Sequence, residues 1–137
     1  MGTLGAGPFE NDDALDFLDD LEDSDPELRL EKVQTALGRV LRSKGYIEAP
    51  LMAEGVAAAV VVAGSDDPEC VAKEPYLPRW LDEEPLDVDE QLEELATKVL
   101  HRALRHDDNE WWELWEEADA SDEVTEMVSR YLDALGD

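Results

Sequence analysis

The segment from Pro50 to Ala63 constrains the fold of this chain more than any other. After Gly55 it is apolar on almost every side of a helix, and residues 56–63 read VAAAVVVA. A helix that is apolar all round has to be buried, so this segment is predicted to lie at the centre of a helical bundle. The run is much shorter than the ~20 apolar residues of a membrane-spanning helix, and no membrane span is expected.

Apolar residues at helical spacing predict further helices on both sides of this segment, and no stretch alternates like a strand for more than a few residues. The predicted elements are a helix after Asn11 that ends before Asp25, one from Pro26 to Gly45, one over 50–63, one that opens at Asp87 or Asp89, and two over 110–118 and 122–135. Residues 64–86 contain four prolines and are predicted to form an ordered loop with one helical turn at 79–83. The expected fold is an all-α single domain, residues 1–137, with about five to six helices.

The net charge of −26, from 37 Asp and Glu against 11 Lys and Arg, narrows the possible partners. Nucleic-acid binding needs a basic face that displaces counterions from phosphates, so no nucleic-acid partner is expected. Docking on anionic lipid is disfavoured for the same reason. The charge is also uneven, because residues 1–27 hold ten acids and no base while 28–50 carry a net +3. We expect the basic second helix to pair with the acidic first one.

The carboxylates do not fall into a pattern typical of a metal site. The acidic runs at 19–25 and 87–90 lack the glycine and the spacing of a calcium-binding loop. Neither His101 nor His106 is preceded by a glutamate at the spacing of a di-iron helical bundle. The two histidines are five apart and would not share a helix face. No metal and no cofactor is predicted.

Catalytic and targeting motifs are likewise not evident. Cys70 has no nearby histidine to activate it, and as the single cysteine it cannot form an internal disulfide. The glycines at 5–7 are too few for a phosphate-binding loop. The first residues show no basic and apolar signal segment, and Ala6 stands where myristoylation requires Ser or Thr. We expect a cytoplasmic protein that is not an enzyme.

Three tryptophans in five residues, 111–115, are the most unusual apolar feature. Trp111 and Trp115 share a helix face, whereas Trp112 is rotated by about 100° from them. Trp112 either packs on the proline-containing loop or Trp80, or is an exposed anchor ringed by glutamates at an interface with a basic partner. The candidate partner surface consists of Asp107, Asp108, Trp112, Glu113, Glu116 and Glu117.

The N-terminal run GTLGAGPFENDDA at 2–14 resembles the opening motif of a family of small bacterial proteins, the domain of unknown function 4259. The usual form of that motif is Gly-Thr-Trp-Gly-x-Gly-Pro-Phe-Asp-Asn-Asp-x-Ala, and this chain departs from it at Leu4 and Glu10. The resemblance continues more loosely through 46–64 and 114–117. It implies a small, acidic, helical protein without a signal peptide, and it implies no activity. Small acidic bacterial proteins of this kind sometimes serve as immunity partners that neutralise toxins, which is an analogy of type.

The motif has two physical interpretations. As a clasp, its glycines permit backbone turns, Phe9 staples the start of the first helix, and polar side chains hold the folded-back N-terminus. As a site, it is a polar surface loop for a ligand or partner. The motif residues concerned are Gly2, Thr3, Gly5, Gly7, Pro8, Phe9, Asn11 and Asp12.

The leading functional hypothesis is a non-enzymatic interaction protein that binds a basic partner through its acidic surface. Its strongest form is an immunity or inhibitor protein. In that form, the carboxylates of 107–126 mimic phosphates and bind a nuclease or another cationic toxin. One alternative is that the acidity serves only solubility, as in high-GC or salt-adapted genomes. Another is a metal or enzymatic site assembled from carboxylates of separate helices. Homodimerisation through the tryptophan helix is a further alternative, which the shared negative charge opposes.

Overall fold

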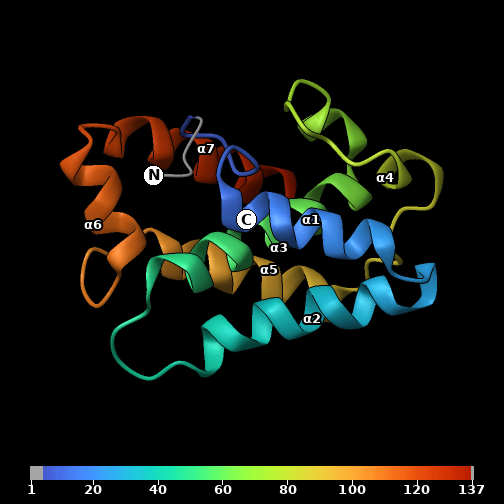
Figure 1. The fold of residues 1–137 in the computed structure, drawn as a ribbon, viewed down its shortest axis with the longest axis horizontal. Coiled ribbons are helices and arrows are strands. Elements are labelled where there is room, and N and C mark those ends of the chain that lie inside the picture. Colours follow the sequence, from blue (N-terminus) through green and yellow to red (C-terminus); the bar gives the residue numbers. More distant parts are fainter. Residues whose placement is uncertain (1–4, 137) are drawn as a thin grey trace.

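The computed structural model describes residues 5–136, and this part of the chain is all-α, as the sequence predicts (Figure 1). It contains no β-strand, and six of its helices have eight or more residues. The helical elements are α1 (Asp12–Asp23), α2 (Pro26–Arg42), α3 (Ala49–Asp66), the 3-10 helix η1 (Pro68–Val71), α4 (Trp80–Glu83), α5 (Glu90–Ala103), α6 (Glu110–Glu117) and α7 (Ser121–Ala134). Gly2 and Thr3 of the N-terminal motif lie outside the described residues.

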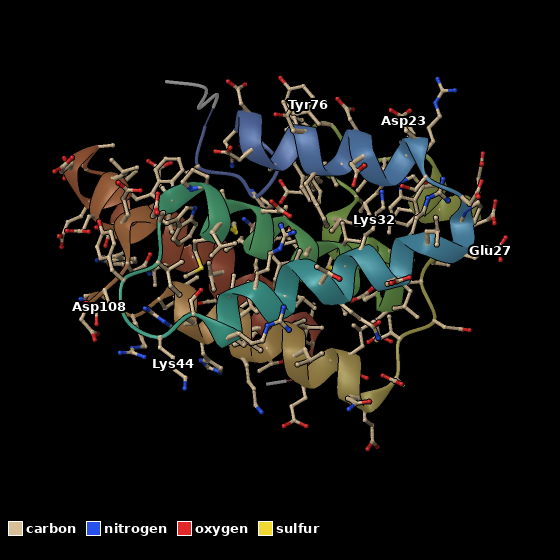
Figure 2. The ribbon with its side chains drawn as sticks, turned by 60° about the horizontal axis from the view of Figure 1, so that its bottom comes forward. Asp23, Glu27, Lys32, Lys44, Tyr76 and Asp108 are labelled. Carbon is tan, nitrogen blue, oxygen red and sulfur yellow. The ribbon has the colours of Figure 1, made fainter. Side chains whose placement is uncertain are left out.

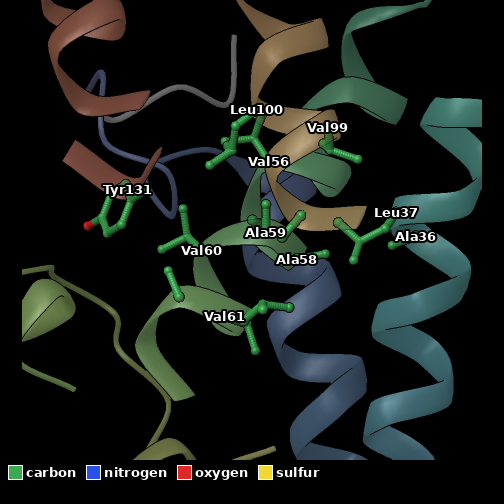
Figure 3. Packing of buried hydrophobic residues seen from close by; sticks show 14 of the residues in the cluster. Ala36, Leu37, Val56, Ala58, Ala59, Val60, Val61, Val99, Leu100 and Tyr131 are labelled. Atoms are coloured by element: carbon green, nitrogen blue, oxygen red, sulfur yellow. The ribbon is translucent and has the colours of Figure 1, made fainter. Parts of the chain in front are cut away.

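Helix α3 lies at the centre of the bundle and contacts every other helical element of the described chain, which confirms the position predicted for it. All of its residues from Gly55 to Gly64 are buried. Figure 3 shows Val56 and Val60 of α3 among side chains of the surrounding helices, including Val99 of α5 and Tyr131 of α7. Burial of this apolar surface is the main favourable term for the fold.

Small residues on α3 let the neighbouring helices approach closely. A Cβ added at Gly55 would lie 2.5 Å from Cγ2 of Val40 in α2 and 3.4 Å from Cγ1 of Val99 in α5. The prediction that α3 ends at Ala63 is wrong, because Gly64 is a buried packing residue and the helix continues to Asp66. Because Gly64 has no side chain, Val71 can pack against it. A Cβ added at Gly64 would lie 2.9 Å from Cγ2 of Val71.

By length and composition alone, α3 is also apolar enough to cross a membrane. Two-thirds of its 18 residues, 67%, are buried inside the structure. Core helices that are mostly buried pass the same length and composition test.

Helices α1 and α2 lie side by side as a hairpin (Figure 1), and one ion pair between them confirms the predicted pairing in part. Nζ of Lys32 lies 3.0 Å from Oδ1 of Asp20, and Figure 2 shows this lysine between the two helices. Arg29 is 7% exposed, and its Nε donates a 2.9 Å hydrogen bond to the carbonyl oxygen of Leu21 in the last turn of α1. Its guanidinium also stacks over the ring of Trp80, 4.6 Å from the ring centre. The basic second helix therefore stabilises the acidic first one.

Candidate functional site

The N-terminal motif packs onto the start of α1 through its apolar residues. Pro8 is buried and Phe9 is fully buried, and Oδ1 of Asn11 accepts a 2.8 Å hydrogen bond from the backbone N–H of Ala14 as the predicted N-cap. Glu10, a residue the sequence analysis did not assign to the clasp, folds back so that its Oε2 accepts a 2.8 Å hydrogen bond from the N–H of Gly7. These contacts favour the clasp interpretation for residues 5–11.

The role expected for Gly5 and Gly7, conformational freedom of the backbone, does not fit the structure. Neither residue has a positive φ; among the described glycines, Gly45 and Gly136 do. The Glu10 carboxylate instead occupies the space of their missing side chains. A Cβ at Gly5 would lie 3.0 Å from Cδ of Glu10, and one at Gly7 would overlap Oε2. The two glycines make room for the carboxylate that closes the turn.

Asn109 joins the end of α5 to the start of α6. Its side chain is fully buried, and its Nδ2 donates 2.9 Å hydrogen bonds to the carbonyl oxygens of Ala103 and Arg105. Its Oδ1 accepts a 3.1 Å hydrogen bond from the backbone N–H of Trp112. One amide thus satisfies the last carbonyls of one helix and a first N–H of the next. The sequence signal, an asparagine just before an apolar helical segment, is a known N-cap signature that our sequence analysis did not use.

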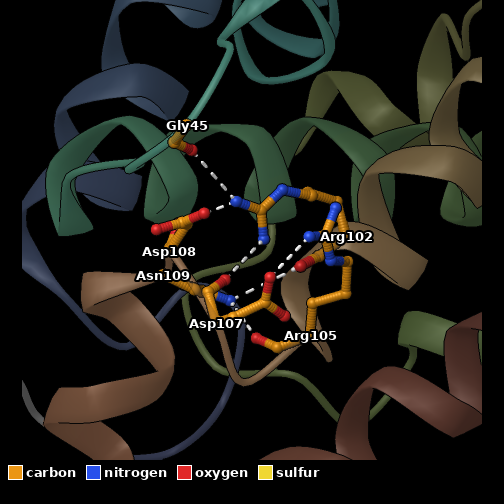
Figure 4. A network of polar contacts seen from close by, with 6 residues as sticks. All are labelled: Gly45, Arg102, Arg105, Asp107, Asp108 and Asn109. Carbon is orange, nitrogen blue, oxygen red and sulfur yellow. Dashed lines mark hydrogen bonds and ion pairs between the residues drawn. The ribbon is translucent and has the colours of Figure 1, made fainter.

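Arg102 holds the turn at 107–109 against the α2–α3 connection (Figure 4). Its Nη2 donates to the carbonyl oxygens of Asp108, at 2.7 Å, and of Gly45, at 3.3 Å. The same two segments are joined by backbone hydrogen bonds, from Ile47 N–H to the Asp108 carbonyl at 2.9 Å and from Glu110 N–H to the Ile47 carbonyl at 3.0 Å. Residues 45–47 and 107–110, some sixty positions apart in the sequence, are therefore joined by hydrogen bonds into one corner of the fold.

Two of the predicted partner-surface residues belong to this corner. Oδ2 of Asp107 lies 2.7 Å from Nη2 of Arg105, and this hydrogen-bonded ion pair lowers the pKa of the Asp107 carboxyl. Asp108 adopts a positive φ of 53° in the turn, and its carbonyl oxygen binds Arg102. The charge of Asp107 is thus partly compensated within the chain, and the main chain of Asp108 has a structural role.

Of the two alternatives for Trp112, a buried ring and an exposed anchor, the exposed anchor is wrong. Its side chain is 5% exposed, and its ring stacks on His106 with the ring centres 4.3 Å apart and the planes 8° from parallel. Trp111 is also 5% exposed. Both can be buried because α6 contacts α3 as well as α7, and so is not a peripheral helix with a single covered face.

The outward side of α6 combines acidic and apolar side chains, and we call Glu113, Leu114, Glu116 and Glu117, with Tyr46, the α6 face. The three glutamates are exposed, and Leu114 among them is one of the large apolar residues of the described chain that remain exposed, at 36%. Tyr46 is 53% exposed, and its hydroxyl donates a 2.7 Å hydrogen bond to Oε2 of Glu113. That hydrogen bond is the main reason that the pKa of Tyr46 rises to about 12.

A cavity of about 450 Å³ lies beside this face, between the first turns of α1 and α3 and the helix α6. We call it the indole cavity, because Trp111 and Trp115 are both lining residues; the centres of their rings are 6.4 Å apart and the planes are at 78°. Its other apolar lining comes from Ala49, Pro50, Ala53, Leu114 and Ala118.

The polar residues of the indole cavity are Asn11, Asp12, Asp13 and Glu110. Oε1 of Glu110 accepts a 2.7 Å hydrogen bond from the backbone N–H of Ala49, so this carboxylate caps the start of α3. Asp12 and Asp13 form the first turn of α1 and are exposed. Sequence analysis did not identify this cavity, because its walls come from three helices that are far apart along the chain.

A second hollow, of about 660 Å³, is lined by four glutamates, at 10, 74, 123 and 126, and by Arg130. Burial raises the pKa of Tyr131, and the hydrogen bond that its hydroxyl donates to Glu74 raises it further. Within residues 5–136, no group of three or more His, Cys, Asp or Glu side chains is placed to hold a metal ion. Cys70 is half-buried, and its burial with nearby carboxylates raises the pKa of the thiol to about 11.

Comparison with known proteins adds a family to this description. No curated protein and no solved structure matches the chain. A family model does match, over residues 2–127, and it is described as a domain of unknown function, DUF4259. The match covers nearly the whole chain and includes the N-terminal motif, α6 and the indole cavity. The chain belongs to the DUF4259 family.

Proposed function

We propose that this protein is an interaction module that binds a basic partner protein through the α6 face. The observation that carries the proposal is the exposed Leu114 at the border of three exposed glutamates, Glu113, Glu116 and Glu117. Protein interfaces have an apolar centre and a polar rim, and a rim of one charge selects partners of the opposite charge. Leu28 is also exposed, at 44%, but the hollow that it lines contains Lys32 and Arg39 beside Asp20 and Glu31, so the charge around it is mixed.

Some carboxylates of the chain are compensated by a neighbouring cation. Asp20 is paired with Lys32 at 3.0 Å, and Asp107 is paired with Arg105 at 2.7 Å. The block 107–126 contains ten acids and no base, and Glu116 and Glu117 lie exposed at the end of α6. A basic partner would supply the missing positive charge. In the immunity or inhibitor form of the proposal, these carboxylates take the place of phosphates in the site of a nuclease or another cationic toxin.

A capture experiment with two charge-reversed variants tests the proposal. Glu116→Lys/Glu117→Lys alters the α6 face, and Glu83→Lys/Glu84→Lys is its matched control. Both glutamate pairs are exposed at the C-terminal end of a short helix, where the helix dipole favours a lysine. The two double variants change the net charge by the same amount. Each protein is immobilised and exposed to bacterial lysate at about 0.15 M salt, where the Debye length is about 8 Å.

We expect the native protein and the control to enrich the same basic protein, and the α6 variant to retain at least tenfold less of it. If that protein is a toxin, the native chain should inhibit it and the α6 variant should not. Equal capture by all three proteins, equal loss from both variants, or enrichment of no basic protein would contradict the proposal. Equal loss from both variants would indicate binding through the overall negative charge, and enrichment of no basic protein would support an acidity that serves solubility alone.

A further inference from the structure

We infer that the indole cavity is the pocket for one cationic side chain, a lysine or arginine of the basic partner. This inference rests on the proposed function and adds to it the position and the chemistry of the anchoring contact. The cavity and the α6 face are continuous, because Leu114 belongs to both. A partner seated on the α6 face would therefore cover the mouth of the cavity.

The charge of the cavity favours a cation. Its lining contains three carboxylates, of Asp12, Asp13 and Glu110, and no Lys, Arg or His. The first turns of α1 and α3 contribute only about half a positive charge each, against three full negative charges. An apolar side chain in the cavity would leave the negative charges of these carboxylates uncompensated at the covered interface, whereas a cation would compensate them.

The shape and the apolar lining favour a cation on a long stem. The faces of indole rings attract ammonium and guanidinium groups, and Trp111 and Trp115 bring two such rings to one cavity at 78° to each other. Ala49, Pro50 and Ala53 provide the apolar wall on which the methylene groups of lysine or arginine would lie.

The charge of this chain argues against a second copy of itself as the occupant. Two copies would each bring a net charge of −26 to the interface, and the cavity would then face carboxylates. A basic partner has the opposite effect, since each cation it brings meets an excess of anions. The occupant is therefore assigned to the partner of the α6 face.

The direct test uses short capped peptides, Gly-Gly-X-Gly-Gly, in which X is arginine, lysine or the neutral, linear norleucine. Binding is followed by NMR of the indole N–H groups of the isotope-labelled native protein. A single side-chain contact is weak, so the peptides are titrated to about 20 mM. We expect saturable shifts at the indoles of Trp111 and Trp115 with arginine and lysine, and at least tenfold weaker binding of norleucine. Equal shifts with norleucine, shifts elsewhere, or no shifts would overturn the inference.

Two variants locate the site. Ala118→Phe adds a ring to an exposed residue of the cavity lining and should abolish the shifts, whereas Ala72→Phe adds the same ring to an exposed alanine outside it. Glu110→Gln keeps the acceptor for the N–H of Ala49 and removes a negative charge, so it should weaken arginine binding at least threefold without unfolding α3. Binding unchanged by both Ala118→Phe and Glu110→Gln would overturn the assignment to this cavity.

Together, the peptide and capture experiments distinguish an error in the pocket assignment from an error in the proposed function. If the α6 face captures a basic protein and Ala118→Phe captures it equally well, the proposed function stands and the pocket is rejected. If the peptides bind the native cavity but no basic protein is captured, the cavity binds cations and the proposed function is rejected. If neither the peptides nor a basic protein binds, both are rejected.

Discussion

Asn109 and Ala103 lie on either side of the turn between α5 and α6 and are joined by a buried 2.9 Å hydrogen bond from Nδ2 to the Ala103 carbonyl oxygen. The same side chain also accepts from the N–H of Trp112, so one amide joins the two helices, in addition to the hydrogen bonds that Arg102 and Ile47 make at this corner. The α6 face and the indole cavity are built on that helix, so their geometry depends on Asn109 as well.

Replacing Asn109 with alanine should therefore cost more than the loss of an ordinary helix cap. Removing the side chain leaves buried carbonyls without a donor, at about 1–3 kcal/mol, and removes an N-cap, at about 1 kcal/mol. We expect Asn109→Ala to lower the free energy of unfolding by about 2–4 kcal/mol. This loss in the free energy of unfolding is measured by urea unfolding followed by tryptophan fluorescence. Asn11→Ala, which removes a single cap on α1, is the control at about 1 kcal/mol, and equal losses in both variants would refute the dual role.

Gly55 provides a second test, of the close packing of α2 on α3. An alanine there improves helix propensity by about 1 kcal/mol, but its Cβ would lie 2.5 Å from Cγ2 of Val40, and overpacking of this kind costs about 1–3 kcal/mol. We expect Gly55→Ala to lower the urea midpoint. Gly38→Ala should raise it or leave it unchanged, because the nearest atom to its Cβ, at 2.7 Å, is the flexible Arg42 guanidinium. A stabilised Gly55→Ala would contradict the packing argument.

The thiol of Cys70 should be nearly inert in the native protein. Burial and the neighbouring Asp67 and Glu74 raise its pKa from 9.0 to about 11, which leaves about 100-fold less thiolate at pH 7. We expect alkylation by iodoacetamide to be about 100-fold slower than in urea-unfolded protein, and to accelerate about tenfold per pH unit up to pH 11. Mass spectrometry measures the rate, with Cys70→Ser as the blank. A native rate within threefold of the unfolded rate would show that the thiol is not protected.

Salt should stabilise the fold, because a net charge of −26 makes the folded chain repel itself. Raising the ionic strength from about 0.1 M to about 1 M shortens the Debye length from about 10 Å to about 3 Å and screens that repulsion. We expect the urea midpoint to rise over this range, and the protein to be folded already in dilute buffer, since Lys32 and Arg29 compensate part of the charge of α1. A chain that folds only in molar salt would instead indicate salt adaptation as the reason for its acidity.

The periodicity of the sequence predicted the helices well because each is specified by its own residues. Asn11 and Asp89 are N-caps at the expected places, and their side chains accept hydrogen bonds of 2.8 Å from Ala14 and Leu92. The central position of α3 followed from its composition, because a helix without a polar face has to be covered on all sides.

The periodicity of the sequence does not predict contacts between distant parts of the chain. Whether Trp112 is buried depends on His106 and on the two helices that flank α6, and no spacing rule places these elements. The indole cavity likewise requires Glu110 next to Ala49, a pair separated by 61 positions. The glycines at 5 and 7 were assigned to backbone freedom because a sequence does not show that the Glu10 side chain folds back over them.

The small residues of α3 also bear on the entropy of folding. Ala57, Ala58 and Ala59 are fully buried at the centre of the bundle, and an alanine has no side-chain rotamers to lose. A leucine at each of these positions would lose about 0.5–1 kcal/mol of rotamer freedom on burial. The most enclosed helix of this protein is therefore also one of the least costly to order, which offsets part of the repulsion among its surface carboxylates.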